Sequence, residues 1–147
     1  MGTLAVTFRG SSQPRGVRNN NPGNIIDSPF ARSQPGYQGS DGTFARFANP
    51  DQGRAAAENL LSGGTYHNLG QTRGLQGIFE RYAPAGHGDN NPTAYAARVA
   101  RQLGVDPRAP INTRDPRTRR QLYNAIHGVE NGVAPTQQGR WFSGNTR

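Results

Sequence analysis

Residues 15–25 read RGVRNNNPGNI, and this stretch decides how the N-terminal part of the chain folds. Three consecutive asparagines run into Pro22-Gly23-Asn24, a composition that neither core packing nor a solvated surface would select. Asn21 to Asn24 is typical of a β-turn. We expect a type II turn, with Pro22 at its second position and Gly23 supplying the positive φ at its third. The sequence therefore predicts a polar loop of fixed shape.

Such a loop presents a row of carboxamides, namely Asn19, Asn20, Asn21 and Asn24. A carboxamide both donates and accepts hydrogen bonds without carrying charge, which suits sugar hydroxyls and acetamido groups better than phosphates. The same side chains could instead bond to their own backbone in a structural loop, and the two roles are compatible. We take these four asparagines as candidate substrate-binding residues.

Three helix starts follow along the chain, and each has a capping residue directly before a proline: Asn49-Pro50, Asn91-Pro92 and Asp115-Pro116. Proline is well tolerated at the first helical position because its missing N–H would have no partner there. Glycines predict the ends of these helices, at Gly63-Gly64, at Gly104 and near Gly132. A further helix, capped by Thr72, is expected to end before Pro84.

The expected fold is mainly α (α+β): a small helical domain of about four helices with a short extended element around residues 44–47. Both ends of the chain are polar and poor in apolar side chains. We therefore expect an N-terminal arm (1–14), a domain (15–132) and a C-terminal arm (133–147), with the arms contacting other chains.

Several motifs together resemble a family of small tailed-phage proteins that includes virion structural proteins and lysozyme-like proteins. The resemblance covers roughly residues 15 to 135. It rests on the segment 15–25 and, in order, on Phe44-Ala45-Arg46-Phe47-Ala48, Asp51-Gln52-Gly53-Arg54-Ala55, Arg81-Tyr82-Ala83-Pro84, Thr93-Ala94-Tyr95 and Glu130-Asn131-Gly132. This likeness implies that 15–132 is a lysozyme-like domain that meets peptidoglycan.

The chain is more distantly similar to bacterial N-acetylglucosaminidases. Those enzymes carry a catalytic Glu shortly before the Asn-Asn pair, whereas residues 1–18 of this chain contain no Asp or Glu. The resemblance also implies a supporting catalytic role for Tyr82, in the Tyr-Ala position. The other possibility for Tyr82 is a core aromatic with a satisfied hydroxyl.

Cleaving a glycosidic bond requires a carboxylic acid that can protonate the leaving oxygen. Glu130 is the first candidate, because a carboxylate at the C-terminal end of a helix opposes the helix dipole and stability alone would not place it there. Asp89 is the second, because it lies in the loop between two predicted helices, with Tyr82 and Tyr95 on either side. The candidate catalytic residues are thus Glu130, Asp89 and Tyr82, and Tyr95 joins the candidate substrate-binding residues.

The charge of the chain predicts an anionic partner. All 17 basic residues other than histidine are arginines, against 9 acidic residues, which gives a net charge of +8. Guanidinium groups bind carboxylates and phosphates bidentately, so peptidoglycan, nucleic acid and acidic surfaces of other virion proteins are all candidate partners.

Other chemistries are not supported by the sequence. The chain has no cysteine, and His67, His87 and His127 do not have the spacing of metal ligands, so we expect no metal and no cofactor. No apolar run is long enough to span a membrane, and we expect neither a signal peptide nor a membrane partner.

These observations predict a virion-associated structural protein of a tailed phage, made in the host cytoplasm, with a lysozyme-like domain that interacts with peptidoglycan. Whether it cuts glycan is open. The first alternative is an active phage peptidoglycan hydrolase, an endolysin or entry lysozyme that acts as a glycosidase or lytic transglycosylase. The second alternative is a DNA-contacting virion protein.

Overall fold

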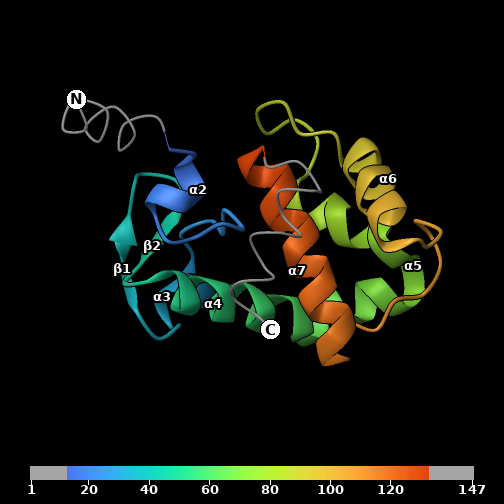
Figure 1. Cartoon of the computed structure of the whole chain (residues 1–147), viewed down its shortest axis with the longest axis horizontal. Helices are drawn as coiled ribbons and strands as arrows, with labels where there is room; N and C mark the ends of the chain where they lie inside the picture. The colour runs from blue at the N-terminus through green and yellow to red at the C-terminus, as the bar shows by residue number, and fades with distance from the viewer. Residues whose placement is uncertain (1–12, 133–147) are drawn as a thin grey trace, which may run out of the picture. The chain divides into compact units, whose positions relative to one another are not determined.

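A computed structural model describes residues 13–132, which fall into two compact units (Figure 1). The first unit comprises 13–57 and 130–132, and the second comprises 58–129. The chain is mainly helical with one small sheet, as the sequence predicts. The expected arms, apart from Gln13 and Pro14, lie outside the described residues. Between residues 13 and 132, no helix combines the length and the apolar character needed to cross a membrane.

The first unit contains two short helices and the sheet. Helix α2 (Arg15–Arg18) precedes the Asn-rich loop and α3 (Pro29–Arg32) follows it. Strands β1 (Tyr37–Ser40) and β2 (Ala45–Phe47) pair antiparallel, so the predicted extended element is confirmed. The start of α4 (Pro50–Ser62) and the last residues of α7 (Pro116–Asn131) complete the unit.

The Asn-rich loop forms a turn at the predicted place but not of the predicted type. The Asn24 N–H donates to the Asn21 carbonyl over 2.9 Å, which closes the turn. The positive φ angles belong to Asn20 (54°) and Asn24 (51°), and Gly23 has none, so the expectation of a type II turn was wrong. Asparagine tolerates this left-handed region because its short side chain can hydrogen-bond locally.

The second unit is built from the end of α4, α5 (Gly64–Tyr82), α6 (Pro92–Leu103) and most of α7.

All three predicted proline starts are confirmed. Asn49 Oδ1 accepts from the N–H of Gln52, Asn91 Oδ1 from that of Ala94, and Asp115 Oδ2 from that of Thr118, at 2.9, 3.0 and 2.9 Å. The largest fully buried side chains in the core of the second unit are Leu61, Leu75, Ile78, Phe79, Val99, Leu122 and Ile126.

Helix α5 is longer than the sequence suggests, and Thr72 is not its cap. The Thr72 hydroxyl instead donates to the Asn68 carbonyl, 2.8 Å away within the helix. The helix kinks at Gly74, whose φ is 66°. The segment 107–111, which begins in a turn, packs against this kink, where the N–H of Gln76 donates to the Pro107 carbonyl over 2.9 Å. A glycine at the kink lets the two backbones approach closely.

Candidate functional site

The buried side chain of Asn21 fixes the conformation of the Asn-rich loop through hydrogen bonds. Its side chain is 0% exposed. Its Nδ2 donates to the carbonyls of Ile25 and Ala45, 3.0 and 2.9 Å away, and its Oδ1 accepts from the Ile25 N–H at 3.0 Å. The carboxamide thereby ties the loop to β2. Among the predicted substrate-binding asparagines, Asn21 therefore acts by positioning the others.

The side chain of Asn20 also forms a structural hydrogen bond. Its Nδ2 donates to the Phe47 carbonyl over 3.0 Å. Its own carbonyl oxygen lies only 1.7 Å from where a Cβ on Gly53 would be, so the loop backbone rests directly on the first turns of α4. The motif glycine at position 53 is therefore a close-packing residue.

Asn19 belongs to an ionic cluster that the sequence did not predict. Its Nδ2 donates to Asp41 Oδ2 over 2.8 Å, and Arg15 binds both Asp41 oxygens at 2.5 and 2.9 Å. The hydrogen bond from Arg15 is the main cause that lowers the pKa of Asp41 far below its usual range. The N–H groups of Thr43 and Phe44 donate to the same carboxylate. Asp41 thus stays ionised and anchors the loop to the turn between β1 and β2.

The structure brings Asn24 and Glu130 together although they are 106 residues apart in the chain. Asn24 Nδ2 donates to Glu130 Oε1 over 2.9 Å, and both side chains are half-buried. Asn24 Oδ1 is buried and has no hydrogen-bond partner within residues 13–132. An unpaired buried acceptor costs about 1–3 kcal/mol. The described residues therefore leave the Oδ1 acceptor of Asn24 without a hydrogen bond.

The backbone beneath this pair is tightly packed. Asn131 Nδ2 donates to the Pro22 carbonyl over 2.8 Å. A Cβ on Gly16 would lie 2.7 Å from Asn131 Oδ1 and 3.0 Å from Asn24 Oδ1. The last residues of α7 are thus fixed on the Asn-rich loop. We call Asn24, Glu130 and Asn131 the amide–carboxylate cluster.

The other predicted site residues lie in the second unit. Tyr95 stacks on Phe79 with ring centroids 4.2 Å apart, and Tyr82 packs edge-on against Phe79 and Tyr66 at 6.1 Å from each. Asp89 is exposed in the loop that leads to α6. The two tyrosines thus form part of an aromatic cluster in the core of this unit. Their predicted place beside the Asn-rich loop stays a prediction.

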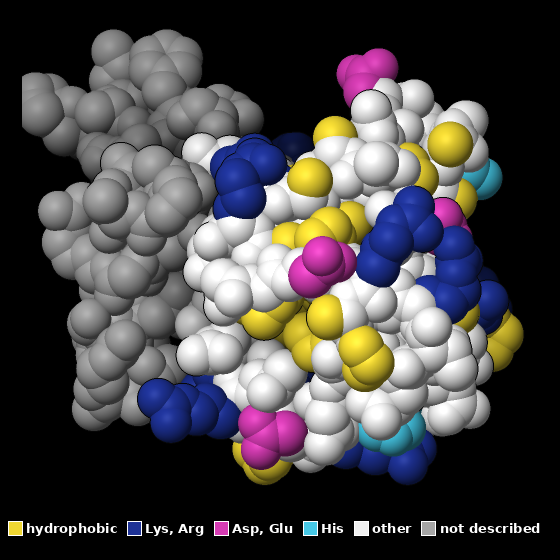
Figure 2. Space-filling view, turned by 90° about the vertical axis from the view of Figure 1, so that its right-hand side faces the viewer, with side chains coloured by type: hydrophobic (Ala, Val, Ile, Leu, Met, Phe, Trp, Pro, Cys, Tyr) yellow, Lys and Arg dark blue, Asp and Glu magenta, His cyan; other side chains and the backbone are white. Residues whose placement is uncertain are grey.

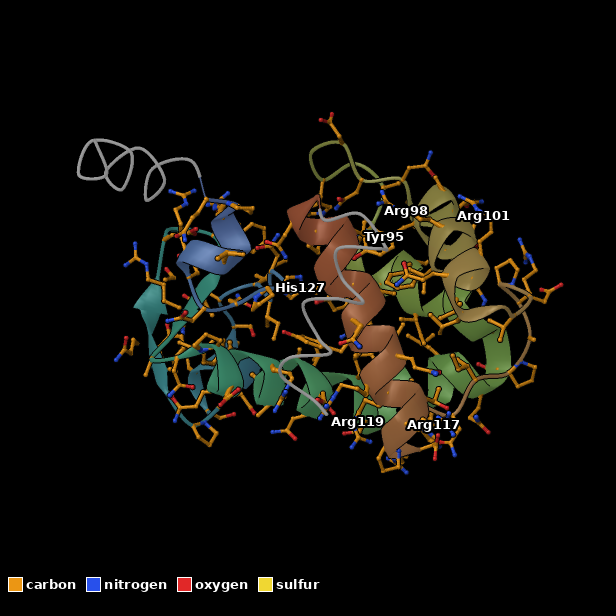
Figure 3. The ribbon with its side chains drawn as sticks, in the orientation of Figure 1. Tyr95, Arg98, Arg101, Arg117, Arg119 and His127 are labelled. Atoms are coloured by element: carbon orange, nitrogen blue, oxygen red, sulfur yellow. The ribbon has the colours of Figure 1, made fainter. Side chains whose placement is uncertain are left out.

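The histidines do not assemble a metal site. Within residues 13–132, no three His, Asp or Glu side chains gather as metal ligands would. His127 is labelled in Figure 3 and belongs to α7. It is buried with its ring edge-on to that of Tyr123, and burial lowers its pKa. A buried imidazole of this kind fits a packing role.

The second unit is the more basic of the two, with nine arginines against five carboxylates, whereas the described part of the first unit has five arginines against four carboxylates. Part of this charge is used structurally, because Glu58 accepts from both Arg119 and Arg120, at 3.2 and 3.1 Å. The exposed side chains of Arg98 and Arg101 have no hydrogen-bond or ion-pair partner between residues 13 and 132, whereas the charge of exposed Arg117 acts on the carboxylate of Asp115. On the face shown in Figure 2, arginine side chains lie in separate groups among apolar and uncharged ones.

No protein-family model matches the chain. The chain is 30% identical over 126 residues to Protein P5 of Pseudoalteromonas phage PM2. The alignment covers 82% of this chain and 73% of the phage protein. Because 126 residues exceed the length of either unit, the similarity extends over both of them.

Proposed function

The chain belongs to the same family as Protein P5 of Pseudoalteromonas phage PM2, and from this similarity to a phage protein we propose that it is a virion-associated structural protein that binds peptidoglycan. Residues 15–132 form its lysozyme-like domain, and the arms 1–14 and 133–147 hold it against other virion proteins. The amide–carboxylate cluster of the first unit contacts the glycan.

The observation that carries this proposal is the hydrogen bond between Asn24 and Glu130. A carboxylate accepts hydrogen bonds from sugar hydroxyls, and the Asn24 carboxamide has a second N–H that can donate to one. Asn21 and the Asp41 cluster hold the loop rigidly, so these groups are positioned before a ligand arrives. Preorganisation of this kind lowers the entropic cost of binding.

A second candidate is cleavage of the glycan with Glu130 as the general acid. Its support is the same geometry, because Glu130 is a half-buried carboxylate held against a loop of carboxamides. Glycosidic cleavage also requires a second group opposite the acid. Asp89 and Tyr82 stay the sequence predictions for further catalytic residues. The contacts described for Glu130 are those of a hydrogen-bonding site, and binding is therefore the function that they support best.

A sedimentation assay with purified peptidoglycan tests this proposal. We expect Glu130→Gln and Asn24→Ala each to weaken binding by about tenfold, because each removes a hydrogen bond that involves a charged group. Asp51→Asn is the matched control, since it removes one negative charge from a side chain that is 90% exposed in the same unit. This control should bind as the wild type does.

Two results would decide against a glycan site at the cluster. One is wild-type binding by both cluster variants, and the other is an equal loss in Asp51→Asn. Release of soluble fragments by the wild type but not by Glu130→Gln would favour the hydrolase.

A further inference from the structure

Ile26 lies at an open edge of the β-structure in the first unit. It forms an isolated antiparallel bridge with Phe44, the residue before β2. Residues on either side of this pair make the two hydrogen bonds of the bridge, from the Asp27 N–H to the Thr43 carbonyl at 2.9 Å and from the Ala45 N–H to the Ile25 carbonyl at 3.0 Å. Ile26 and Phe44 are thus a non-hydrogen-bonded pair, so the N–H and C=O of Ile26 point away from Phe44.

Both the backbone and the side chain of Ile26 are open to a ligand. Its N–H and C=O have no hydrogen-bond partner among residues 13–132, and its side chain is 53% exposed. The side chains of a non-hydrogen-bonded pair lie close together on one face, so Ile26 borders the half-buried ring of Phe44. We call the outward backbone groups of Ile26, together with this apolar pair, the Ile26 edge.

The carboxylate of the next residue, Asp27, is occupied by other side chains. It accepts a hydrogen bond from the Tyr37 hydroxyl at 2.6 Å and pairs with Arg32 at 3.2 Å. These interactions lower the pKa of Asp27, and the guanidinium of Arg32 balances its charge. Successive side chains of an extended segment also point to opposite faces, so Asp27 does not share the face of Ile26. The Ile26 edge is therefore apolar and offers one backbone donor and one backbone acceptor.

We propose that the Ile26 edge binds the peptide stem of peptidoglycan as a short added strand. This inference rests on the proposed function and assigns a place to the peptide part of the polymer. A residue of an extended peptide presents its N–H and C=O in the same direction, so it can exchange two hydrogen bonds with Ile26 as strand residues do. Alanine methyl groups of the stem can then pack on Ile26 and Phe44.

The length of the edge suits a peptide of a few residues better than a long strand. Two positions before Ile26, the N–H of Asn24 already donates to the Asn21 carbonyl, at 2.9 Å. Two positions after it, Ser28 caps α3, and its carbonyl accepts from the Arg32 N–H. A pairing strand thus gains its backbone hydrogen bonds at the single residue Ile26.

The edge also lies close to the proposed glycan contact. Asn24 and Ile26 are two residues apart, so their Cα atoms are separated by at most about 7 Å. In peptidoglycan the peptide stem is attached directly to a sugar of the glycan. A fragment whose sugar contacts Asn24 therefore carries its peptide within reach of Ile26.

An NMR titration of the nitrogen-15-labelled full chain tests the Ile26 edge with two soluble fragments: a peptidoglycan disaccharide that carries its tetrapeptide stem, and the same disaccharide without the peptide. We expect the first to bind about tenfold more tightly and to shift the backbone amide signal of Ile26, because that N–H gains an acceptor. The side-chain amide signal of Asn24 should shift with both fragments. Ile26→Pro removes the N–H and should bring the two affinities within about threefold of each other.

Ile26→Thr is a second variant that keeps both backbone groups and the β-branched shape but removes apolar surface. It should weaken binding of the peptide-bearing fragment by about threefold. Val105→Thr is the matched control, because it makes a similar change at a side chain of the second unit that is 42% exposed. This control should bind both fragments as the wild type does.

Three results would overturn the inference. The first is equal affinity of the wild type for the two fragments while the Asn24 signal still responds, which would leave the glycan contact without a peptide contact. The second is wild-type binding by both Ile26 variants. The third is slow hydrogen exchange of the Ile26 amide before any fragment is added, because another segment of the chain or a second copy would then already occupy the edge. Failure of the proposed function has a different signature, since neither fragment would then shift any signal.

Discussion

Replacing Asn21 by alanine is expected to lower the free energy of unfolding by about 3 kcal/mol or more. The substitution removes three hydrogen bonds and leaves the buried N–H of Ile25 without its acceptor, while the Ile25 carbonyl keeps only the N–H of Ala45 as a donor. Urea denaturation of the full chain measures the loss. Hydrogen exchange at the Ile25 amide should accelerate as well, because that amide loses its acceptor.

Gln38→Ala is the control for this change, since it truncates an exposed carboxamide in the same unit. Its stability should stay within about 0.5 kcal/mol of the wild type. A loss below about 1 kcal/mol in Asn21→Ala would show that the loop does not depend on this side chain, and it would contradict the claim that Asn21 preorganises the site.

The second large effect is expected at Gly74, where alanine should also cost about 3 kcal/mol or more. A Cβ at this position would lie 2.4 Å from the Ala109 carbonyl oxygen and 2.8 Å from that of Pro107. The backbone also has a φ of 66°, which L side chains rarely adopt. Because the obstructing atoms belong to the backbone, no side-chain rotation can relieve the clash.

Gly64→Ala provides a matched comparison in the same helix. A Cβ there meets nothing within 4 Å, and its φ is not positive. We expect this change to stabilise the chain by about 0.4–1 kcal/mol through the entropy of the unfolded state. Thermal unfolding of the two variants should therefore move the midpoint in opposite directions, and a destabilised Gly64→Ala or a neutral Gly74→Ala would refute the packing described at the kink.

Local sequence signals predicted most of the helices. Proline preceded by Asn or Asp defines the start of α4, α6 and α7, because both residues act on backbone groups within one turn. The course of α5 could not be predicted in the same way. Its kink depends on segment 107–111, more than 30 residues away in the chain, and Thr72 resembles a cap although it lies inside the helix.

In the candidate site, too, local features could be predicted from the sequence and contacts between distant residues could not. The Asn-rich motif predicted a fixed loop. It could not predict which asparagine side chains form hydrogen bonds within the protein, because their partners lie on β2 and α7. Glu130 was selected because it opposes a helix dipole, and nothing in the spacing indicated that Asn24 would be its partner. The pairing of Arg15 with Asp41 was missed because the two residues are 26 positions apart and Asp41 lies in a turn.

The central claim is that the amide–carboxylate cluster contacts glycan, and an NMR titration of the nitrogen-15-labelled full chain with soluble peptidoglycan fragments tests it most directly. The side-chain amide signal of Asn24 should shift with increasing ligand, together with the backbone signals of Glu130 and Asn131. The side-chain amide of Asn21, which is fully buried, should move far less. Saturable shifts confined to residues outside this cluster, or no shift anywhere, would contradict the claim.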